Sequence, residues 1–323
     1  MRLFPHNVAK SLIYHSKCTD IFTNLALEDW FYKHLDFSVI QKALMVWRNE
    51  PCVVIGRHQN PWIECNFFTL PNMGVKLARR NSGGGTVYHD LGNLNLTFFT
   101  DRNQYNRKHN LELIIRALKK SFNIDSEINH REDLCINNCK ISGTASKLGR
   151  TSAYHHCTLL VNANKDNMKL ALKNDLKENI KTNATVSIRS EIMNLNEICP
   201  GITVEQVMKA LMQEYNETFQ ESKVHVVEPI DEQFPGVTEI KKTFLSQVWR
   251  FEKTPKFTIF HSVRDKEQEL RYFLTIERGK VVNAGCESDE FNNKDIFLQF
   301  LDMPFSQEVL NDFQTVTFVQ PTK

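Results

Sequence analysis

Apolar and polar positions recur along the chain with two spacings, and each spacing predicts one kind of element. Apolar residues at every third or fourth position form the buried face of a helix, whereas short apolar runs bounded by turn residues form strands. The first pattern predicts helices over residues 20–35, 62–68, 107–122, 167–176 and 204–219. The second predicts strands over residues 43–47, 52–55, 75–78, 86–88, 94–100, 151–161, 257–263, 271–277 and 280–284.

Two hairpins are predicted in the first half of the chain, and the Arg278-Gly279 turn joins the last two strands. Only Arg48-Asn49-Glu50-Pro51 separates the runs 43–47 and 52–55, and residues 133–145 turn back at Asn137-Asn138. Because most strands follow one another in hairpins, with helices between them, the order favours an α+β fold over a doubly wound parallel sheet.

Length and turn residues divide the chain into two predicted domains. A chain of 323 residues suggests two domains, by a prior of roughly 150 residues each. Pro229 and Pro235-Gly236 predict a linker around 222–242. We therefore expect a large domain over 20–225 and a small accessory domain over 243–323.

The first nineteen residues carry a one-sided charge. Arg2, Lys10 and Lys17 occur there, and no acidic residue appears before Asp20. This bias is typical of a mitochondrial presequence, and a disordered amino terminus fits the same residues. Residues 1–19 are therefore a candidate targeting segment.

Composition excludes several classes of protein. A hydrophobic content of 41% and a charged content of 24% suit a soluble globular protein with a core. The net charge of +2 shows no bias toward nucleic acid, and no run approaches the ~20 apolar residues that cross a membrane. The eight cysteines lack CxxC or Cys/His zinc spacing, so we expect reduced intracellular thiols and no metal site.

The stretch from Ala78 to Asp90 contains the first candidate for chemistry. Gly83-Gly84-Gly85 follow Arg79-Arg80, between two predicted strands. Glycine lets a ligand approach the main-chain N–H groups, so a basic glycine turn can hold a carboxylate or phosphate. The alternative is a plain hairpin turn with solvated arginines. The stretch matches neither a P-loop nor a dinucleotide-binding fingerprint, so a kinase or dehydrogenase has no support.

A second candidate is Lys140, which begins the stretch Lys140-Ile-Ser-Gly-Thr-Ala145. A lysine beside small residues can neutralise a phosphate or polarise a carbonyl. An exposed edge-strand lysine is the simpler alternative. Arg131 adds positive charge nearby. Together with Arg80 and the glycine turn, Lys140 would suit an acyl-adenylate, which brings an acyl carbonyl and an α-phosphate into one site.

Cys157 is the one candidate nucleophile, because it follows His155 and His156. Alternation along a strand places Cys157 and His155 on one face with apolar neighbours. A structural cysteine is the favoured interpretation, and a thioester step through Cys157 stays open.

These motifs resemble the lipoate-protein ligase A family. The resemblance is carried by residues 79–93 and 140–145, supported by 51–65, 154–160 and 187–195, and it covers roughly residues 20–320. Within the family the chain is most similar to the animal mitochondrial lipoyltransferases. The resemblance implies a biotin/lipoyl protein ligase-like catalytic domain with mixed and antiparallel sheets, and a small α+β carboxy-terminal domain.

The resemblance also implies an acyltransferase that moves a lipoyl or octanoyl group from lipoyl-AMP, or from a lipoylated carrier, to a protein lysine. Lys140 would be catalytic and would contact the acyl carbonyl and the phosphate. The implied lipoyl-AMP contacts are Arg80, Ser82, Gly83, Gly84, Gly85, Thr86, Val87, Tyr88, Arg131, Lys140, Thr158, Thr182 and Ala184.

The implied partners are lipoyl domains of 2-oxoacid dehydrogenase E2 subunits and the glycine cleavage H protein, in the mitochondrial matrix. Neither nucleic acid nor membrane is implied. Lipoyl-AMP would be a substrate, with no permanently bound cofactor, and Mg²⁺ would enter only if ATP-dependent activation is retained. The alternatives are a full ATP-dependent lipoate ligase, a non-catalytic lipoyl-AMP or lipoyl-domain binding module, and a biotin ligase.

The acceptor lysine needs a proton acceptor, because a free lysine has a pKa near 10.4. His89 and Asp90 are candidates by proximity in sequence. The strands of Trp47, Val54 and Leu77 could form the apolar slot for the lipoyl chain.

Overall fold

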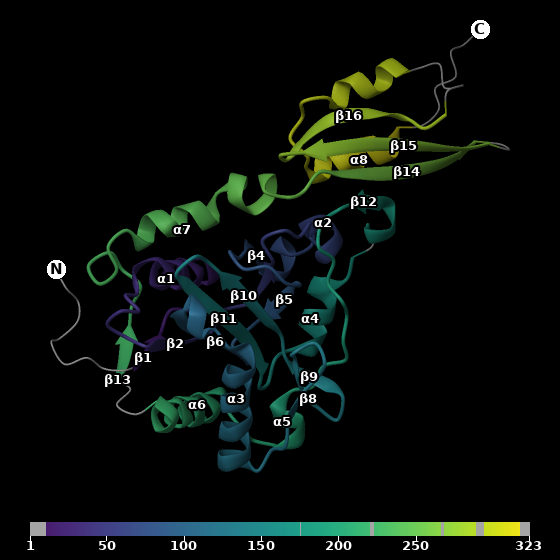
Figure 1. Ribbon diagram of the computed structural model, residues 1–323. Coiled ribbons are helices and arrows are strands. Elements are labelled where there is room, and N and C mark those ends of the chain that lie inside the picture. Colours follow the sequence, from purple (N-terminus) through teal and green to yellow (C-terminus); the bar gives the residue numbers. More distant parts are fainter. Residues whose placement is uncertain (1–10, 175, 220–222, 266–267, 289–293, 317–323) are drawn as a thin grey trace, which may run out of the picture.

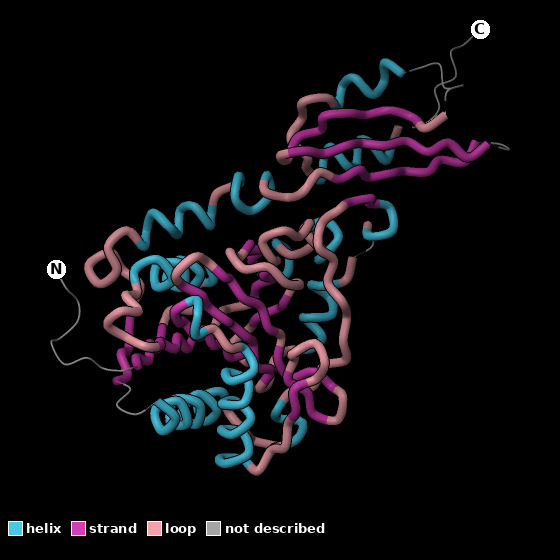
Figure 2. The backbone as a smooth tube through the Cα atoms, viewed as in Figure 1, coloured by secondary structure: helices cyan, strands magenta, loops and turns pink. Residues whose placement is uncertain are grey.

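The computed structural model describes residues 11–174, 176–219, 223–265, 268–288 and 294–316 (Figure 1). Its helices and strands form one large mixed sheet, three smaller sheets and covering helices (Figure 2). The helices are α1 Ile21–His34, α2 Pro61–Glu64, α3 Arg107–Phe122, α4 Lys165–Leu172, α5 Leu195–Ile198, α6 Val204–Phe219, α7 Val237–Leu245 and α8 Gln307–Thr315. Within the described residues, no helix has the length and apolar content that a membrane crossing requires.

The large sheet has the strand order β10-β11-β6-β2-β1-β13. Its strands are β1 Ser11–Ser16, β2 Lys42–Trp47, β6 Asn93–Asp101, β10 Thr144–Leu148, β11 Ser152–Leu160 and β13 Lys223–Val227. Alternate residues of β2 face opposite layers, as the pleat of a strand requires. Leu44 and Val46 pack against α3 and α6, whereas Met45 and Trp47 pack on the side of α1.

Helix predictions succeed where caps and periodicity agree. The helices over 107–122 and 204–219 have the predicted bounds, and Asp20 caps α1 by accepting a hydrogen bond from the Thr23 backbone N–H. The shorter helices α2 and α4 end several residues before the predicted 68 and 176.

The predicted hairpin of residues 43–47 and 52–55 is wrong. Both strands exist, but β2 pairs with β1 and β6, whereas β3 Cys52–Ile55 pairs with β4 Lys76–Arg79 and β5 Val87–His89. Asn49 in the connection is fully buried and accepts a hydrogen bond from Asn24 of α1. The chain therefore crosses into the next layer instead of turning back.

The hairpin over 133–145 is confirmed as β8 Leu134–Ile136 and β9 Cys139–Ser142, joined to β7 Glu127–Ile128 in a three-stranded sheet. Asn137 and Asn138 both have positive φ, at 50° and 64°, which a two-residue hairpin turn requires.

The carboxy-terminal sheet has the order β12-β14-β15-β16, with α8 and a 3-10 helix over Lys294–Phe300. Its strands are β12 Ile180–Thr182, β14 Phe257–Asp265, β15 Gln268–Glu277 and β16 Lys280–Cys286. The linker expected around 222–242 is wrong, because β13 pairs in parallel with β1 and α7 contacts α1. The domain limits at 225 and 243 stay a prediction.

The presequence expected over 1–19 falls partly outside the described residues, which begin at 11. Residues 11–16 form β1, an interior strand between β2 and β13, and they are almost entirely buried. A cleavage after residue 19 would remove this strand from the sheet, so the targeting limit at 19 conflicts with the fold.

Arg79 joins the carboxy-terminal segment to β4. Its side chain is fully buried and donates hydrogen bonds to the backbone carbonyls of Gln59 (2.7 Å) and Arg250 (2.8 Å) and to the Thr254 hydroxyl (2.8 Å). In the same contact, the Trp249 indole N–H donates a hydrogen bond to the Arg79 carbonyl at 2.8 Å. Arg79 therefore anchors the segment after α7 directly beside the glycine turn.

We expect Arg79→Met to lower the free energy of unfolding by about 3 kcal/mol or more, because several buried carbonyls lose their donor. Urea denaturation followed by circular dichroism measures this change. Arg150→Met is the matched control, since Arg150 is exposed, and its effect should stay within about 0.5 kcal/mol. Equal stabilities for the two variants would contradict this role of Arg79.

Candidate active site

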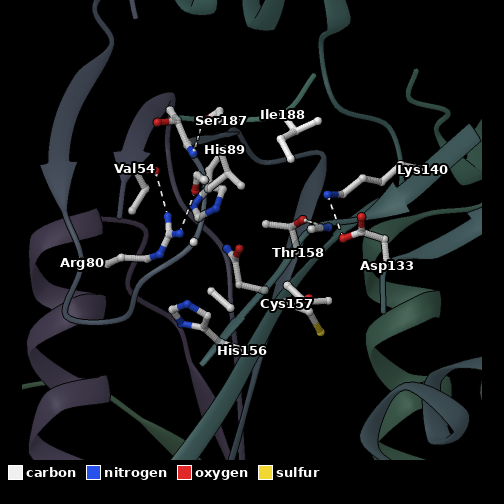
Figure 3. A pocket seen from close by; sticks show the side chains of 18 of the residues that line it. Val54, Arg80, His89, Asp133, Lys140, His156, Cys157, Thr158, Ser187 and Ile188 are labelled. Atoms are coloured by element: carbon white, nitrogen blue, oxygen red, sulfur yellow. Dashed lines mark hydrogen bonds and ion pairs between the residues drawn. The ribbon is translucent and has the colours of Figure 1, made fainter. Parts of the chain in front are cut away.

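A cavity of about 310 Å³ lies where the glycine turn, β9 and the centre of the large sheet meet (Figure 3). Figure 3 shows Lys140 and Asp133 on one side and Arg80 and Val54 on the other. Eight of the residues predicted to contact the ligand line it: Arg80, Gly84, Gly85, Thr86, Val87, Arg131, Lys140 and Thr158.

Five predicted contact residues do not line the cavity: Ser82, Gly83, Tyr88, Thr182 and Ala184. Alternation along β5 directs Val87 and His89 to the cavity and Tyr88 into the core shared with the carboxy-terminal sheet. In the segment that follows β12, Thr185, Val186, Ser187 and Ile188 line the cavity, so the lining begins one residue after Ala184.

Arg80 holds the glycine turn from inside. Its guanidinium donates to the carbonyls of Val54 (3.0 Å), Gly83 (2.6 Å) and Gly85 (2.7 Å), and its Nε donates to the Ser82 hydroxyl at 2.8 Å. Burial lowers the Arg80 pKa to about 10, which still leaves it charged at neutral pH. Three of these four hydrogen bonds go to the turn itself and the fourth goes to β3, so Arg80 shapes the turn more than it contacts a ligand.

Two glycines allow this turn to pack closely. A Cβ on Gly56 would lie 2.2 Å from the Gly84 carbonyl oxygen, which no side chain can accommodate. Gly84 itself has φ of 84°, in the left-handed region that favours glycine. The turn can therefore pack against the end of β3 only because both positions, 56 and 84, are glycine.

The segment 185–188 is tied to the turn through Ser187. The Ser187 hydroxyl bonds to the buried Glu64 carboxylate and accepts hydrogen bonds from the Thr86 backbone N–H (2.8 Å) and the Gln59 amide (3.0 Å). Val186 and Ile188 on either side are exposed, with Ile188 at 70%. Ser187 thus ties a largely exposed segment that lines the cavity to the glycine turn and to α2.

A buried chain of hydrogen bonds connects α1 to the turn through His156. His156 Nδ1 lies 2.8 Å from Glu28 Oε1, and His156 Nε2 lies 2.8 Å from the Ser82 hydroxyl. A carboxylate only accepts, so Nδ1 carries the proton and Nε2 faces the serine. The sequence of hydrogen bonds from Glu28 to His156 to Ser82 resembles that of an activated serine nucleophile. Ser82, however, is only 1% exposed and does not line the cavity. The chain is therefore a support for the turn.

Lys140 and Asp133 form an ion pair inside the cavity, with Lys140 Nζ 2.8 Å from Asp133 Oδ1. Among the described residues that line the cavity, Asp133 is the only acid. The backbone of Lys140 also bonds to the chain beyond the 185–188 segment, through Glu191 O (2.8 Å) and Met193 N (3.1 Å). These bonds place the ammonium opposite the glycine turn.

Part of the cavity has an apolar lining. Leu25, Trp47 and Val54 line it and are at most 3% exposed. Two members of the predicted slot, Trp47 and Val54, are therefore present. The third, Leu77, is wrong, because alternation along β4 turns it into the core beneath the carboxy-terminal sheet.

Neither residue proposed as a proton acceptor suits that role. Asp90 accepts backbone N–H groups from Gly92 (2.9 Å) and Asn164 (2.8 Å) and does not line the cavity. His89 lines it, but burial, with the charge of Arg80, lowers the His89 pKa to about 3. An imidazole with that pKa is a weak base.

Sequence reasoning missed Asp133, His156, Glu28 and Glu64 as parts of the site. Glu28 and Glu64 lie in helices, and no motif or spacing in the chain connects them with the glycine turn. Within the described residues, no three His, Cys, Asp or Glu side chains gather as metal ligands.

Cys157 is buried beside the cavity, and burial raises its pKa to about 12. At pH 8 only about one in 10⁴ of such thiols is ionised, and the thiolate is the reactive form. We expect iodoacetamide at pH 8 to leave Cys157 unmodified in the folded protein and to modify the half-buried Cys139. Peptide mass spectrometry measures both, and urea-unfolded protein is the control. Equal labelling of the two cysteines in the folded protein would contradict an inert Cys157.

Comparison with known proteins agrees with this geometry. Mitochondrial lipoyl amidotransferase LIPT1 of Homo sapiens is 43% identical over 295 residues, which are 89% of this chain and 79% of that protein. Lipoate-protein ligase A of Psychrobacter cryohalolentis is 37% identical over 290 residues, covering 88% and 84%. The structure of P. falciparum LipL1 in complex with lipoate has a TM-score of 0.66 and 28% identity over 96% of both chains.

The predicted α+β fold with mixed and antiparallel sheets is confirmed by the sheet order and by this structural likeness. The family model of the lipoyl protein ligase A/B catalytic domain matches residues 20–216, which include the glycine turn, Lys140 and the segment 185–188. The chain belongs to the lipoyl protein ligase A/B catalytic-domain family.

Proposed function

We propose that this chain is an acyltransferase that moves a lipoyl or octanoyl group onto the lysine amine of a lipoyl domain. The observation that carries the proposal is one cavity that combines apolar lining residues with Lys140 and the glycine turn. The human relative at 43% identity is named a lipoyl amidotransferase, and an amide is the product of acyl transfer to an amine.

An acyl-adenylate suits the two ends of the cavity. Its apolar chain would enter the end lined by Leu25, Trp47 and Val54, and its mixed anhydride would lie between Lys140 and the turn. The Lys140 ammonium would offset charge on the phosphate and on the carbonyl oxygen as the tetrahedral intermediate forms. Backbone N–H groups of Gly84 and Gly85 are close enough to the cavity to serve as further donors.

In the transfer step, the neutral acceptor amine attacks the acyl carbonyl carbon. A C–N bond forms, the bond between that carbon and the phosphate oxygen breaks, and AMP leaves with the electron pair. Asp133, 2.8 Å from Lys140, is placed to accept the proton that the amine loses. Cys157 takes no part, and its raised pKa also protects the cyclic disulfide of a lipoyl group from thiol attack.

Lys140→Ala should reduce acyl transfer from synthetic lipoyl-AMP to a lipoyl domain by at least about 10²-fold, because the charge on the intermediate loses its partner. Mass spectrometry of the acceptor domain measures transfer, and circular dichroism checks the fold. Lys165→Ala is the matched control, since Lys165 lies on the surface in α4 and pairs with Glu197. Near-normal transfer by folded Lys140→Ala would refute the proposal.

The same assay identifies the acyl donor. The protein is incubated with its acceptor and either lipoyl-AMP, a lipoylated carrier domain, or lipoate with ATP and Mg²⁺. Product from the first two alone defines a transferase. Product from lipoate and ATP defines a full ligase, the second candidate, which the 37% identity to a bacterial lipoate-protein ligase favours. Binding of lipoyl-AMP without any transfer would instead define a binding module.

Asp133→Asn should lower kcat by about 10²-fold, the usual contribution of a positioned general base, with little increase in the KM for lipoyl-AMP. The amide keeps the size of the side chain and still accepts a hydrogen bond from Lys140, so a purely structural role would leave kcat nearly unchanged. A kcat that is restored by raising the pH would support loss of a base. Unchanged kcat at neutral pH would exclude Asp133 as the proton acceptor.

The proposed acceptors are the lipoyl domains of 2-oxoacid dehydrogenase E2 subunits and the glycine cleavage H protein. The proposed location is the mitochondrial matrix, which the mitochondrial names of the human and mouse relatives support.

A further inference from the structure

One side chain that lines the cavity beside Trp47 has a buried polar atom without a partner among the described residues. His89 is 3% exposed and lines the cavity, where Figure 3 shows it near Arg80. The centroid of its ring lies 6.1 Å from that of Trp47, in an edge-to-face arrangement. Its Nε2 atom has no hydrogen-bond partner among the described residues. Buried polar atoms are nearly always paired, so an orphan in a ligand cavity points to the ligand.

The tautomer of His89 follows from a chain of buried amides. Asn24 donates its amide N–H to two backbone carbonyls, of Cys18 (2.8 Å) and Arg48 (3.0 Å), which identifies its nitrogen. The same nitrogen lies 2.9 Å from Asn49 Oδ1, so the other end of the Asn49 amide is the donor. That donor lies 2.9 Å from His89 Nδ1.

Because Asn49 donates to His89 Nδ1, that nitrogen carries no proton. The low pKa of His89 keeps the ring neutral at physiological pH, so its one proton resides on Nε2. The Nε2–H donor of His89 is therefore held in a fixed direction by Asn49, whose own orientation is set by Asn24 of α1. Asn95 lies beside Trp47 in the paired strand β6, lines the same cavity, and also has an unpartnered side-chain amide nitrogen.

A buried donor distinguishes the two acyl groups that the proposed reaction could carry. A lipoyl group ends in a dithiolane ring, whose sulfur atoms are weak hydrogen-bond acceptors. An octanoyl group ends in a methyl group, which accepts nothing and leaves the donor desolvated and unpaired. A site built around a donor rejects the analogue that lacks the acceptor far more strongly than it rejects a change in size.

We propose that the Nε2–H group of His89, held by Asn49 and assisted by Asn95, recognises the dithiolane sulfur and makes the site select lipoyl over octanoyl groups. This inference rests on the proposed acyl transfer, because it assigns the part of the same cavity lined by Trp47 and His89. His89 is then a specificity-determining residue, and Asn49 and Asn24 are positioning residues that act through it.

The test compares kcat/KM for lipoyl-AMP and octanoyl-AMP, with a lipoyl domain as acceptor, in the wild type and in His89→Phe. The substitution removes the N–H and keeps an aromatic ring. We expect the ratio of lipoyl to octanoyl kcat/KM to fall by about tenfold, through a higher KM for lipoyl-AMP. His155→Phe is the matched control, because His155 is also fully buried with an unpartnered Nε2 but does not line the cavity. Its ratio should equal that of the wild type.

A second measurement keeps the inference testable if His89→Phe does not fold. In ¹⁵N-histidine-labelled wild-type protein, lipoyl-AMP should shift the His89 Nε2–H resonance and slow its exchange with water, and octanoyl-AMP should do so much less. Equal responses to the two ligands, or a ratio unchanged by a folded His89→Phe, would overturn this inference and leave acyl transfer standing. Transfer of neither acyl group by the wild type would overturn the proposed function and this inference with it.

Discussion

The site depends on the buried guanidinium of Arg80, which donates hydrogen bonds to the Gly83 and Gly85 carbonyls of the glycine turn and to the Val54 carbonyl of β3. A turn of three glycines has high conformational entropy in the unfolded chain, and its carbonyls must be paired once they are buried. Arg80, three residues before the first glycine, donates the hydrogen bonds that pair these carbonyls. Gly84 and Gly85 line the cavity and present no side chain to it.

Buried acids and amides of the surrounding elements hold this turn and its neighbours in place. Glu28 reaches it through His156 and Ser82, and Glu64 reaches it through Ser187. Asn24 sets the orientation of Asn49 and through it that of His89. Such networks are stable only when their members are satisfied, so the groups left over at the cavity, including His89 Nε2, stand out as candidates for ligand contact.

The division of charge along the cavity is the other organising feature. Lys140 and Asp133 compensate one another at the polar side, which offsets the charge of the half-buried Lys140 ammonium before an anionic ligand enters. Leu25, Trp47 and Val54 give another part of the cavity an apolar lining. The cavity can thus accommodate a molecule with one anionic and one apolar end.

The sequence alone determined the elements and the local motifs. Periodicity located α3 and α6, the turn residues Asn137 and Asn138 located the β8–β9 hairpin, and the two motifs identified the glycine turn and Lys140, because each is a property of neighbouring residues. Only the tertiary structure decided which strands pair and which side chains converge. The β2 and β3 strands separate into different sheets, Tyr88 and Leu77 turn into another core, and Glu28 and Glu64 reach the site from helices distant in sequence. These contacts depend on packing between layers, which local spacing does not encode.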